Sequence, residues 1–256
     1  MKEKLTLVKV GGKIVEEPES LQQLLNLFTN IKGKKVLVHG GGRTATDIAS
    51  KMGVETKMID GRRVTDSDML KIVTMVYGGL VNKNIVSSLS KYGVKALGLT
   101  GADMDIIRSH KRINTSVDYG FVGDVDKVDA EMLSFFIDKG IIPVLAPLTH
   151  DAQGCLLNTN ADTIAGETAK SLASIYDVTL VFCFEKKGVL ANPDDDDSVI
   201  SHIDKQYYEQ LKADGIVQGG MLPKLDNSFA ALNAGVSKVI ITRADCLGLG
   251  GTTISL

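Results

Sequence analysis

The chain has 256 residues, of which 44% are hydrophobic and 23% are charged, and its formal net charge is −2. This composition predicts a globular protein with a large core and excludes a strongly basic nucleic-acid surface. No apolar run reaches the roughly 18 residues of a membrane span, no signal peptide precedes the first strand, and the three cysteines lack metal-ligand spacing, so we expect a cytoplasmic protein with reduced thiols.

Short apolar runs alternate with helical patterns along the chain. The expected strands are rich in Val, Ile or Leu, and they cover 5–10, 35–39, 94–99, 141–145, 178–184 and 237–242. Helices are expected between them, beginning near residues 18, 45, 68, 130 and 161. Short strands of this composition are typical of parallel sheets covered on both faces. The alternation therefore predicts an α/β sandwich around a mainly parallel sheet.

Two segments depart from this alternation. Residues 100–128 contain short extended pieces at 106–108, 115–118 and 121–125, which predict an antiparallel hairpin that covers a small-molecule site. The charge run from Asn192 to Asp197 fits no calcium-binding loop. We therefore interpret it as a solvated turn rather than as a cation site.

Two of the expected strands end in glycine-rich turns. Gly11-Gly12 follows the first strand, two positions after Lys9, and Gly40-Gly41-Gly42 follows the second. Glycines leave backbone N–H groups accessible, and a helix that follows adds partial positive charge. The two turns together predict phosphate binding. Neither a Walker pattern nor a GxGxxG motif is present, so a purely structural turn stays the alternative for each.

Three further polar motifs lie at expected helix starts. Arg63 could clamp a carboxylate, or it could be an ordinary surface arginine. The run 158–162 could face a ligand, or Asn160 could only cap the helix that follows. Lys224 follows a glycine loop near a helix N-terminus, where a cation is unfavourable unless an anionic ligand binds beside it. Its position is therefore a hint of an anion site.

In this order, the motifs resemble the amino-acid kinase superfamily, and within it the N-acetylglutamate kinase subfamily. The resemblance covers essentially the whole chain and rests on the ordered set rather than on any single motif. The motifs are Lys9-Val10-Gly11-Gly12, His39-Gly40-Gly41-Gly42, Gly61-Arg62-Arg63-Val64-Thr65, Asn158-Thr159-Asn160-Ala161-Asp162, Gly219-Gly220-Met221-Leu222-Pro223-Lys224 and Gly251-Thr252-Thr253-Ile254.

The resemblance implies a single kinase domain over 1–256 with an open αβα sandwich fold. A lobe at about 1–175 would bind the acylated amino acid, and a lobe at about 176–256 would bind ATP. The implied reaction transfers the γ-phosphoryl group of ATP, which brings Mg²⁺ with it, to the side-chain carboxylate of N-acetylglutamate or another N-acylglutamate. The product would be an acyl phosphate, the second intermediate of arginine biosynthesis.

The resemblance also implies a role for each matching residue. Lys9 and Lys224 would stabilise the transferring phosphoryl group, and Asp162 would hold both lysines in position. The implied substrate-binding residues are Gly41, Gly42, Arg63 and Asn158. The implied nucleotide-binding residues are Gly11, Gly12, Glu185, Gly188, Gly219 and Gly220. Because a carboxylate nucleophile is already ionised at neutral pH, no general base is needed.

Some features depart from the family or leave alternatives open. Lys186 and Lys187 are unusual in the loop at 184–190. The chain starts at its first strand, whereas arginine-inhibited relatives carry an extra N-terminal helix, so we expect an arginine-insensitive homodimer. The alternatives are another small amino-acid kinase, acting on carbamate or glutamate, and a non-catalytic amino-acid or nucleotide sensor. The presence of both lysines with Asp162 argues against a sensor, which needs no transition-state cations.

Overall fold

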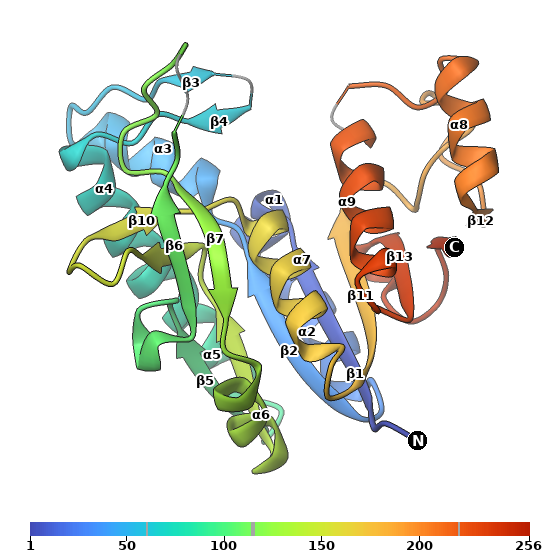
Figure 1. Cartoon of the computed structure of the whole chain (residues 1–256), viewed down its shortest axis with the longest axis horizontal. Coiled ribbons are helices and arrows are strands. Elements are labelled where there is room, and N and C mark those ends of the chain that lie inside the picture. The colour runs from blue at the N-terminus through green and yellow to red at the C-terminus, as the bar shows by residue number, and fades with distance from the viewer. Residues whose placement is uncertain (60, 114–115, 220) are drawn as a thin grey trace.

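The central feature of the fold is one large, mostly parallel sheet. The computed structural model describes residues 1–59, 61–113, 116–219 and 221–256, and within them this sheet has eight strands in the order β12-β14-β13-β11-β1-β2-β8-β5 (Figure 1). Neighbouring strands are parallel except for β13 and β14. The strands are β1 (Lys4–Val10), β2 (Lys34–His39), β5 (Lys95–Leu99), β8 (Ile141–Leu145), β11 (Asp177–Phe184), β12 (His202–Ile203), β13 (Lys238–Arg243) and β14 (Thr252–Ile254).

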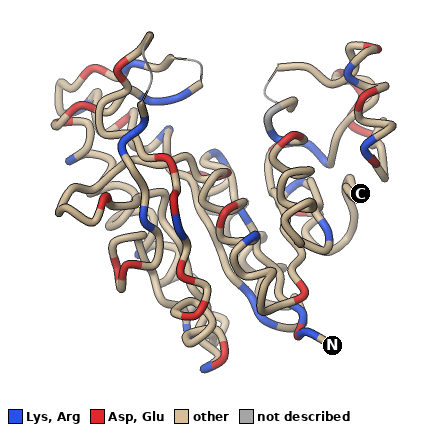
Figure 2. The backbone as a smooth tube through the Cα atoms, in the orientation of Figure 1, with Lys and Arg blue, Asp and Glu red and all other residues tan. Residues whose placement is uncertain are grey.

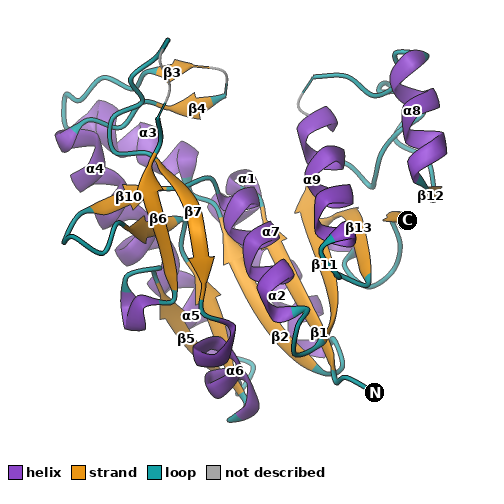
Figure 3. Cartoon of the chain, viewed as in Figure 1, coloured by secondary structure: helices purple, strands orange, loops and turns teal. Residues whose placement is uncertain are grey.

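Helices cover both faces of this sheet (Figure 3). Core residues of α6, α7, α8 and α9 pack with Leu5 and Leu7 of β1, whereas those of α2, α3, α4 and α5 pack with Val8 and Val10. The helices are α1 (Gly12–Glu16), α2 (Pro18–Asn30), α3 (Gly42–Lys51), α4 (Ser67–Val73), α5 (Asn82–Ser90), α6 (Ala130–Asp138), α7 (Ala161–Leu172), α8 (Lys205–Ala213) and α9 (Met221–Asn233). A π-helix, Thr74–Val81, joins α4 to α5.

Smaller sheets lie beside the carboxyl ends of the central strands. The four-stranded one has the order β10-β9-β6-β7, and β3 pairs with β4 (Figure 1). These strands are β3 (Met58–Ile59), β4 (Arg62–Arg63), β6 (Ile107–Lys111), β7 (Gly123–Val128), β9 (Leu148–His150) and β10 (Leu156–Asn158). Short 3₁₀ turns cover Asp103–Asp105 and Ala244–Cys246.

The prediction of an α/β sandwich with a mainly parallel sheet is confirmed. Each of the six expected strands begins and ends within one residue of the observed bounds. The expected hairpin exists as the antiparallel pair β6 and β7. The prediction of an extended piece at 115–118 was wrong for residues 116–118, which form no strand. Asp118 instead accepts a hydrogen bond from Gly120 N in a turn. Thr115 lies outside the described residues.

Basic and acidic residues are distributed together over the whole backbone, in keeping with the small net charge (Figure 2). Among the described helices, none is long and apolar enough to cross a membrane. The division between lobes expected near residue 175 would fall in the connection between α7 and β11. Strands from both sides of that point belong to the one central sheet.

Candidate active site

The two glycine turns lie side by side at the carboxyl ends of neighbouring strands. Strands β1 and β2 are parallel neighbours with Val10 opposite His39, so both chains leave the sheet at the same level. The backbones approach so closely that a Cβ on Gly40 would lie 3.1 Å from Gly12 N. A side chain at Gly40 would therefore push the two turns apart, which explains why glycine stands there.

Each turn leads directly into a helix. Helix α1 begins at Gly12 and α3 begins at Gly42, and the first N–H groups of a helix have no partner within it. Gly11 differs, because its N–H donates to Cys183 O at 3.1 Å and so belongs to the sheet. In the first turn, the backbone N–H groups available to a ligand are therefore those that follow Gly11.

A three-residue ionic cluster joins three elements of the fold. Lys9 Nζ lies 2.7 Å from Asp162 Oδ1, and Lys224 Nζ lies 3.0 Å from Asp162 Oδ2. Strand geometry explains Lys9, which shares with Leu5 and Leu7 the face of β1 that packs against α7. Lys224 lies in the first turns of α9, and its Nζ is 5.2 Å from the centroid of the Phe182 ring.

The start of helix α7 positions the carboxylate of this cluster. Asn160 caps the helix, and its Oδ1 accepts hydrogen bonds from Asp162 N at 2.8 Å and Thr163 N at 3.2 Å. The capping interpretation of Asn160 is therefore confirmed. Burial opposes ionisation of Asp162, but the charges and hydrogen bonds of Lys9 and Lys224 outweigh it and lower its pKa to about 2. One carboxylate between two ammonium groups leaves excess positive charge at the site.

Arg63 is a buried cation rather than a surface residue. Only 8% of its surface is exposed, and among the described residues no carboxylate forms an ion pair with it. Its Nη2 donates to Gly42 O at 2.7 Å and to Thr46 Oγ1 at 2.8 Å, while its Nη1 donates to Thr56 Oγ1 at 3.2 Å. These are neutral acceptors, so the guanidinium charge is left for an anion.

Asn158 lies on the same side of the site, on β10. Its Nδ2 donates to Thr65 Oγ1 at 2.9 Å, and this hydroxyl in turn donates to Arg63 O at 3.1 Å. Residues 63–65 and 158 were separate motifs in the sequence, and the fold joins them through this chain of hydrogen bonds. Asp66 caps α4, because its side chain accepts hydrogen bonds from Asp68 N and Met69 N.

Two adjacent cavities are bordered by these residues. A cavity of about 200 Å³ is bordered by Gly40–Gly42, Arg63, Tyr77 and Asn158. A larger cleft of about 650 Å³ is bordered by Gly11, Gly12, Glu185 and Lys224. Gly42, Met58 and Arg63 border both, so the two cavities lie next to each other.

A model of the amino acid kinase family matches residues 4–243. The chain belongs to this family. It is 66% identical to the acetylglutamate kinase of Bacteroides thetaiotaomicron over 247 residues, which cover 96% of each protein. The solved structure of smu.665 from Streptococcus mutans UA159 is 30% identical, with a TM-score of 0.81 over 98% of each chain. Carbamate kinase from Giardia lamblia bound to AMP-PNP, 14% identical with a TM-score of 0.70 over 98% of each chain, shows the same fold.

The remaining expected positions of this amino acid kinase have different surroundings. Gly188 is required by packing, since a Cβ there would lie 2.6 Å from Thr252 Oγ1. Gly219 has a positive φ of 53° and is exposed just before α9. Gly220 lies outside the described residues. None of these observations places Gly188 or Gly219 against a ligand, so their nucleotide role stays a prediction.

His39 has a structural position in this kinase. It is fully buried, its Nδ1 contacts Gly40 O at 2.7 Å, and its Nε2 contacts Asn82 Nδ2 at 3.1 Å. Burial lowers its pKa to about 4, against the Gly40 hydrogen bond and with help from the charge of Lys83. The neutral ring then donates to the carbonyl and accepts from the amide, which braces the second glycine turn.

Sequence reasoning missed three residues at these cavities. Tyr77 lies on the π-helix, and a Cβ on Gly41 would lie 3.0 Å from its ring; nothing in the local pattern marks it. Lys13 and Arg43 border the cleft immediately behind the two glycine turns. Their positions, one residue into a helix that follows glycines, were a signal that could have found them.

Proposed function

We propose that this chain phosphorylates the side-chain carboxylate of N-acetylglutamate with ATP to give the acyl phosphate. The identity of 66% with a protein named acetylglutamate kinase, over 96% of both chains, carries this proposal. The Lys9–Asp162–Lys224 cluster supports it, because Lys224 borders the larger cleft and Asp162 holds Lys9 beside it, so positive charge is concentrated there. No observation favours carbamate or glutamate as the substrate, or a sensor in place of an enzyme.

The smaller cavity is the proposed site of the acylated amino acid. Arg63 would attract the α-carboxylate, which forms charge-assisted hydrogen bonds stronger than those to Thr46 and Thr56. Asn158 would complete the polar wall, and the amides of Gly41 and Gly42 would face the reacting side chain. The lobe at about 1–175 supplies all of these residues.

The larger cleft is the proposed site of ATP. Gly12 would offer its amide to the phosphates, and Gly11 holds the turn in place through its bond to Cys183 O. The loop from Glu185 to Gly188 and the residue Gly219 would border the nucleotide from the lobe at about 176–256, and a nucleotide contact of Gly220 stays a prediction from the sequence. Each lobe thus supplies one lysine to the transferred phosphoryl group.

The proposed chemistry needs charge stabilisation and alignment more than proton transfer. The substrate carboxylate is ionised at neutral pH and attacks the γ-phosphorus directly. Lys9 and Lys224 would neutralise charge on the transferring group, and Asp162 keeps their ammonium groups near each other. Without these two cations, the substrate carboxylate and the γ-phosphoryl group would repel each other as they approach.

Mg²⁺ is expected with ATP. Among the described residues, no group of three or more His, Cys, Asp or Glu could hold a metal ion, whereas lysines and backbone amides converge on the cleft. This set of groups suits a metal that is bound mainly by phosphate oxygens. When bound, Mg²⁺ would neutralise phosphate charge.

The direct test is formation of a hydroxamate. Purified protein is incubated with ATP, Mg²⁺ and hydroxylamine, which traps an acyl phosphate, and N-acetylglutamate is compared with longer N-acylglutamates, glutamate and carbamate. We expect hydroxamate with an N-acylglutamate. Its absence with every N-acylglutamate would overturn the proposal.

Two further properties belong to the same proposal. We expect a homodimer, which light scattering coupled to size-exclusion chromatography measures directly, and exposed apolar side chains such as Met52, Met75 and Leu80 support self-association. We also place the enzyme in the cytoplasm, where ATP is abundant. Cell fractionation tests that placement.

A further inference from the structure

Most of the charged side chains that border the larger cleft are cations. Among its described bordering residues are five cations, Lys13, Arg43, Arg63, Lys186 and Lys224. Glu185 is the one carboxylate in that described set. A carboxylate repels a polyphosphate that binds beside it, so the position of Glu185 in the proposed ATP cleft needs an explanation.

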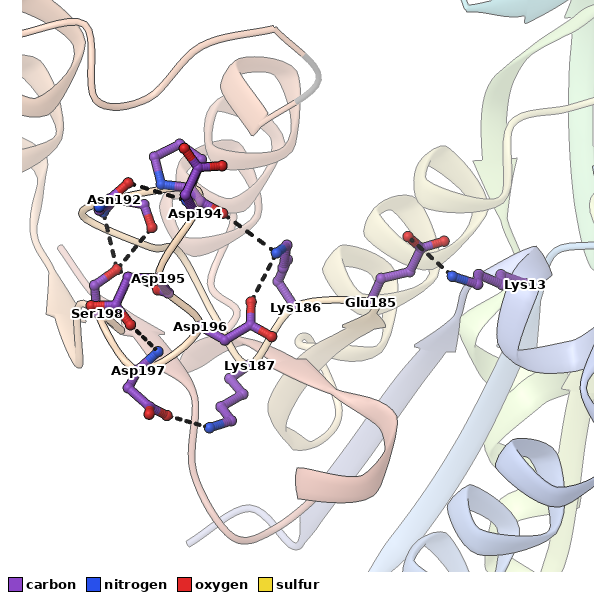
Figure 4. A network of polar contacts seen from close by, with 11 residues as sticks. Lys13, Glu185, Lys186, Lys187, Asn192, Asp194, Asp195, Asp196, Asp197 and Ser198 are labelled. Atoms are coloured by element: carbon purple, nitrogen blue, oxygen red, sulfur yellow. Dashed lines mark hydrogen bonds and ion pairs between the residues drawn. The ribbon is translucent and has the colours of Figure 1, made fainter.

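Glu185 contacts the two cations that follow the glycine turns. Its Oε2 lies 3.7 Å from Lys13 Nζ, and its Oε1 lies 3.5 Å from Arg43 Nη2. Lys13 is the second residue of α1 and Arg43 is the second residue of α3. Glu185 itself comes immediately after β11, so one side chain reaches from this loop to a cation at each glycine turn. Figure 4 shows its contact with Lys13.

The lysines beside Glu185 do not neutralise it. Lys186 Nζ lies 2.8 Å from Asp196 Oδ1, and Lys187 Nζ lies 2.5 Å from Asp197 Oδ1. Figure 4 shows both lysines turned toward the 192–198 loop, while Glu185 meets Lys13 on the other side. The unusual lysine pair and the charge run therefore satisfy each other, and Glu185 is left for the cleft.

We infer that Glu185 is an internal counter-ion of the nucleotide site. It forms ion pairs with Lys13 and Arg43 before nucleotide binds, and the phosphates of ATP then replace it as the partner of both cations. This inference rests on the proposed function, because it takes the cleft as the ATP site. Glu185 then lowers the affinity for polyphosphates and keeps the two cations oriented until the nucleotide arrives. No bond is made or broken in this exchange of ion pairs.

The exchange is easy because the existing contacts are weak. The side chains of Lys13, Glu185 and Arg43 are 44%, 50% and 61% exposed, and their ion pairs are longer than close hydrogen bonds. Exposed pairs of this kind are readily replaced. A triphosphate carries more charge and more acceptor oxygens than one carboxylate, so it displaces Glu185.

The test is nucleotide binding by calorimetry to the full chain, without and with Mg²⁺, for the wild type and Glu185→Gln. We expect the variant to bind ATP about two- to fivefold more tightly, the range of an exposed ion pair, with a smaller gain for ADP and none for adenosine. Glu19→Gln, which removes an equal charge from exposed α2, is the matched control and should bind ATP as the wild type does.

A second comparison locates the effect. In an Arg43→Gln background, the gain from Glu185→Gln should shrink, because one of the two cations that Glu185 competes for is gone. Unchanged or weaker ATP binding by Glu185→Gln would overturn the inference, as would weaker adenosine binding or a larger Mg²⁺ requirement. Hydroxamate formation by the wild type is measured separately, so failure of the proposed function is distinguished from failure of this inference.

Discussion

Lys9 and Lys224 contact the two oxygens of one carboxylate, at 2.7 and 3.0 Å, although they come from opposite ends of the chain. The carboxylate belongs to Asp162, whose pKa of about 2 keeps it ionised at every working pH. Two like charges therefore approach each other only because a third group lies between them. The first two predictions follow from this arrangement.

Lys224→Met removes one of the two cations proposed to stabilise the phosphoryl group. We expect kcat to fall on the order of 10²–10³-fold, the usual effect of losing one preorganised donor, with a much smaller change in KM. Hydroxamate kinetics measure both values, and exposed Lys32→Met serves as the control. An increase in KM alone would mean that the lysine only binds nucleotide.

Asp162→Asn keeps the size of the side chain but removes the charge between the lysines. We expect kcat to fall about tenfold or more, because Lys9 and Lys224 then repel and lose their shared anchor. Since Asp162 stays ionised far below pH 5, the wild-type kcat profile should show no step from it between pH 5 and 9. Equal kcat values for variant and wild type would contradict the anchoring role.

Arg63→Met replaces a buried cation with an apolar side chain of similar length. We expect KM for the acylated amino acid to rise about tenfold or more, since the charge that would attract its carboxylate is lost. We also expect no loss of thermal stability, because a buried unpaired charge is itself costly. Arg63→Lys, which keeps the positive charge, should still have a KM above that of the wild type, because an ammonium group cannot reproduce the planar contacts to Gly42 and Thr46.

Gly40→Ala tests the contact between the two glycine turns. The added methyl group would lie 3.1 Å from Gly12 N, so the turns must separate and the amides that face the cleft must move. We expect lower kcat and lower thermal stability together. Gly79→Ala is the matched control, because a Cβ there meets nothing within 4 Å, and it should change neither value.

His39 predicts a pH dependence of folding stability. Its folded pKa of about 4 lies below the ordinary value of 6.5, so between these values the unfolded chain binds a proton that the folded protein does not. Stability should therefore fall as pH drops from 6.5 to 4, by up to roughly 3 kcal/mol from this group. Urea unfolding of the wild type and His39→Gln measures it, and identical pH slopes for the two proteins would contradict it.

The sequence was sufficient for the central strands because their signal is local. Runs such as 5–10 and 178–184 are apolar on both faces, so their composition predicts buried parallel strands without knowledge of their partners. The π-helix at 74–81 was not predicted, because it carries two glycines and no amphipathic pattern. The short strands β12 and β14 were missed because two or three residues carry no periodicity.

The candidate site was accessible mainly through the order of its motifs. Asn160 as a cap and Asp66 as a cap follow from local chemistry. The contacts of Lys224 with Asp162 and of Asn158 with Thr65 do not, because they join residues 62 and 93 positions apart. Nor could sequence reasoning show that Gly11 gives its N–H to Cys183, since that bond depends on the neighbour of β1 in the sheet.

The central position of β1 also has a consequence for how the chain is made. Strand β1 is made before both of its neighbours, and it pairs with β2 on one side and with β11, Asp177–Phe184, on the other. Until residue 184 has left the ribosome, one edge of β1 exposes unpaired backbone groups that invite wrong pairing. The step that completes the sheet also brings Phe184 and Glu185 to the cleft. Folding of the nascent chain should thus finish late, and a ribosome-bound fragment ending before β11 should be prone to aggregation.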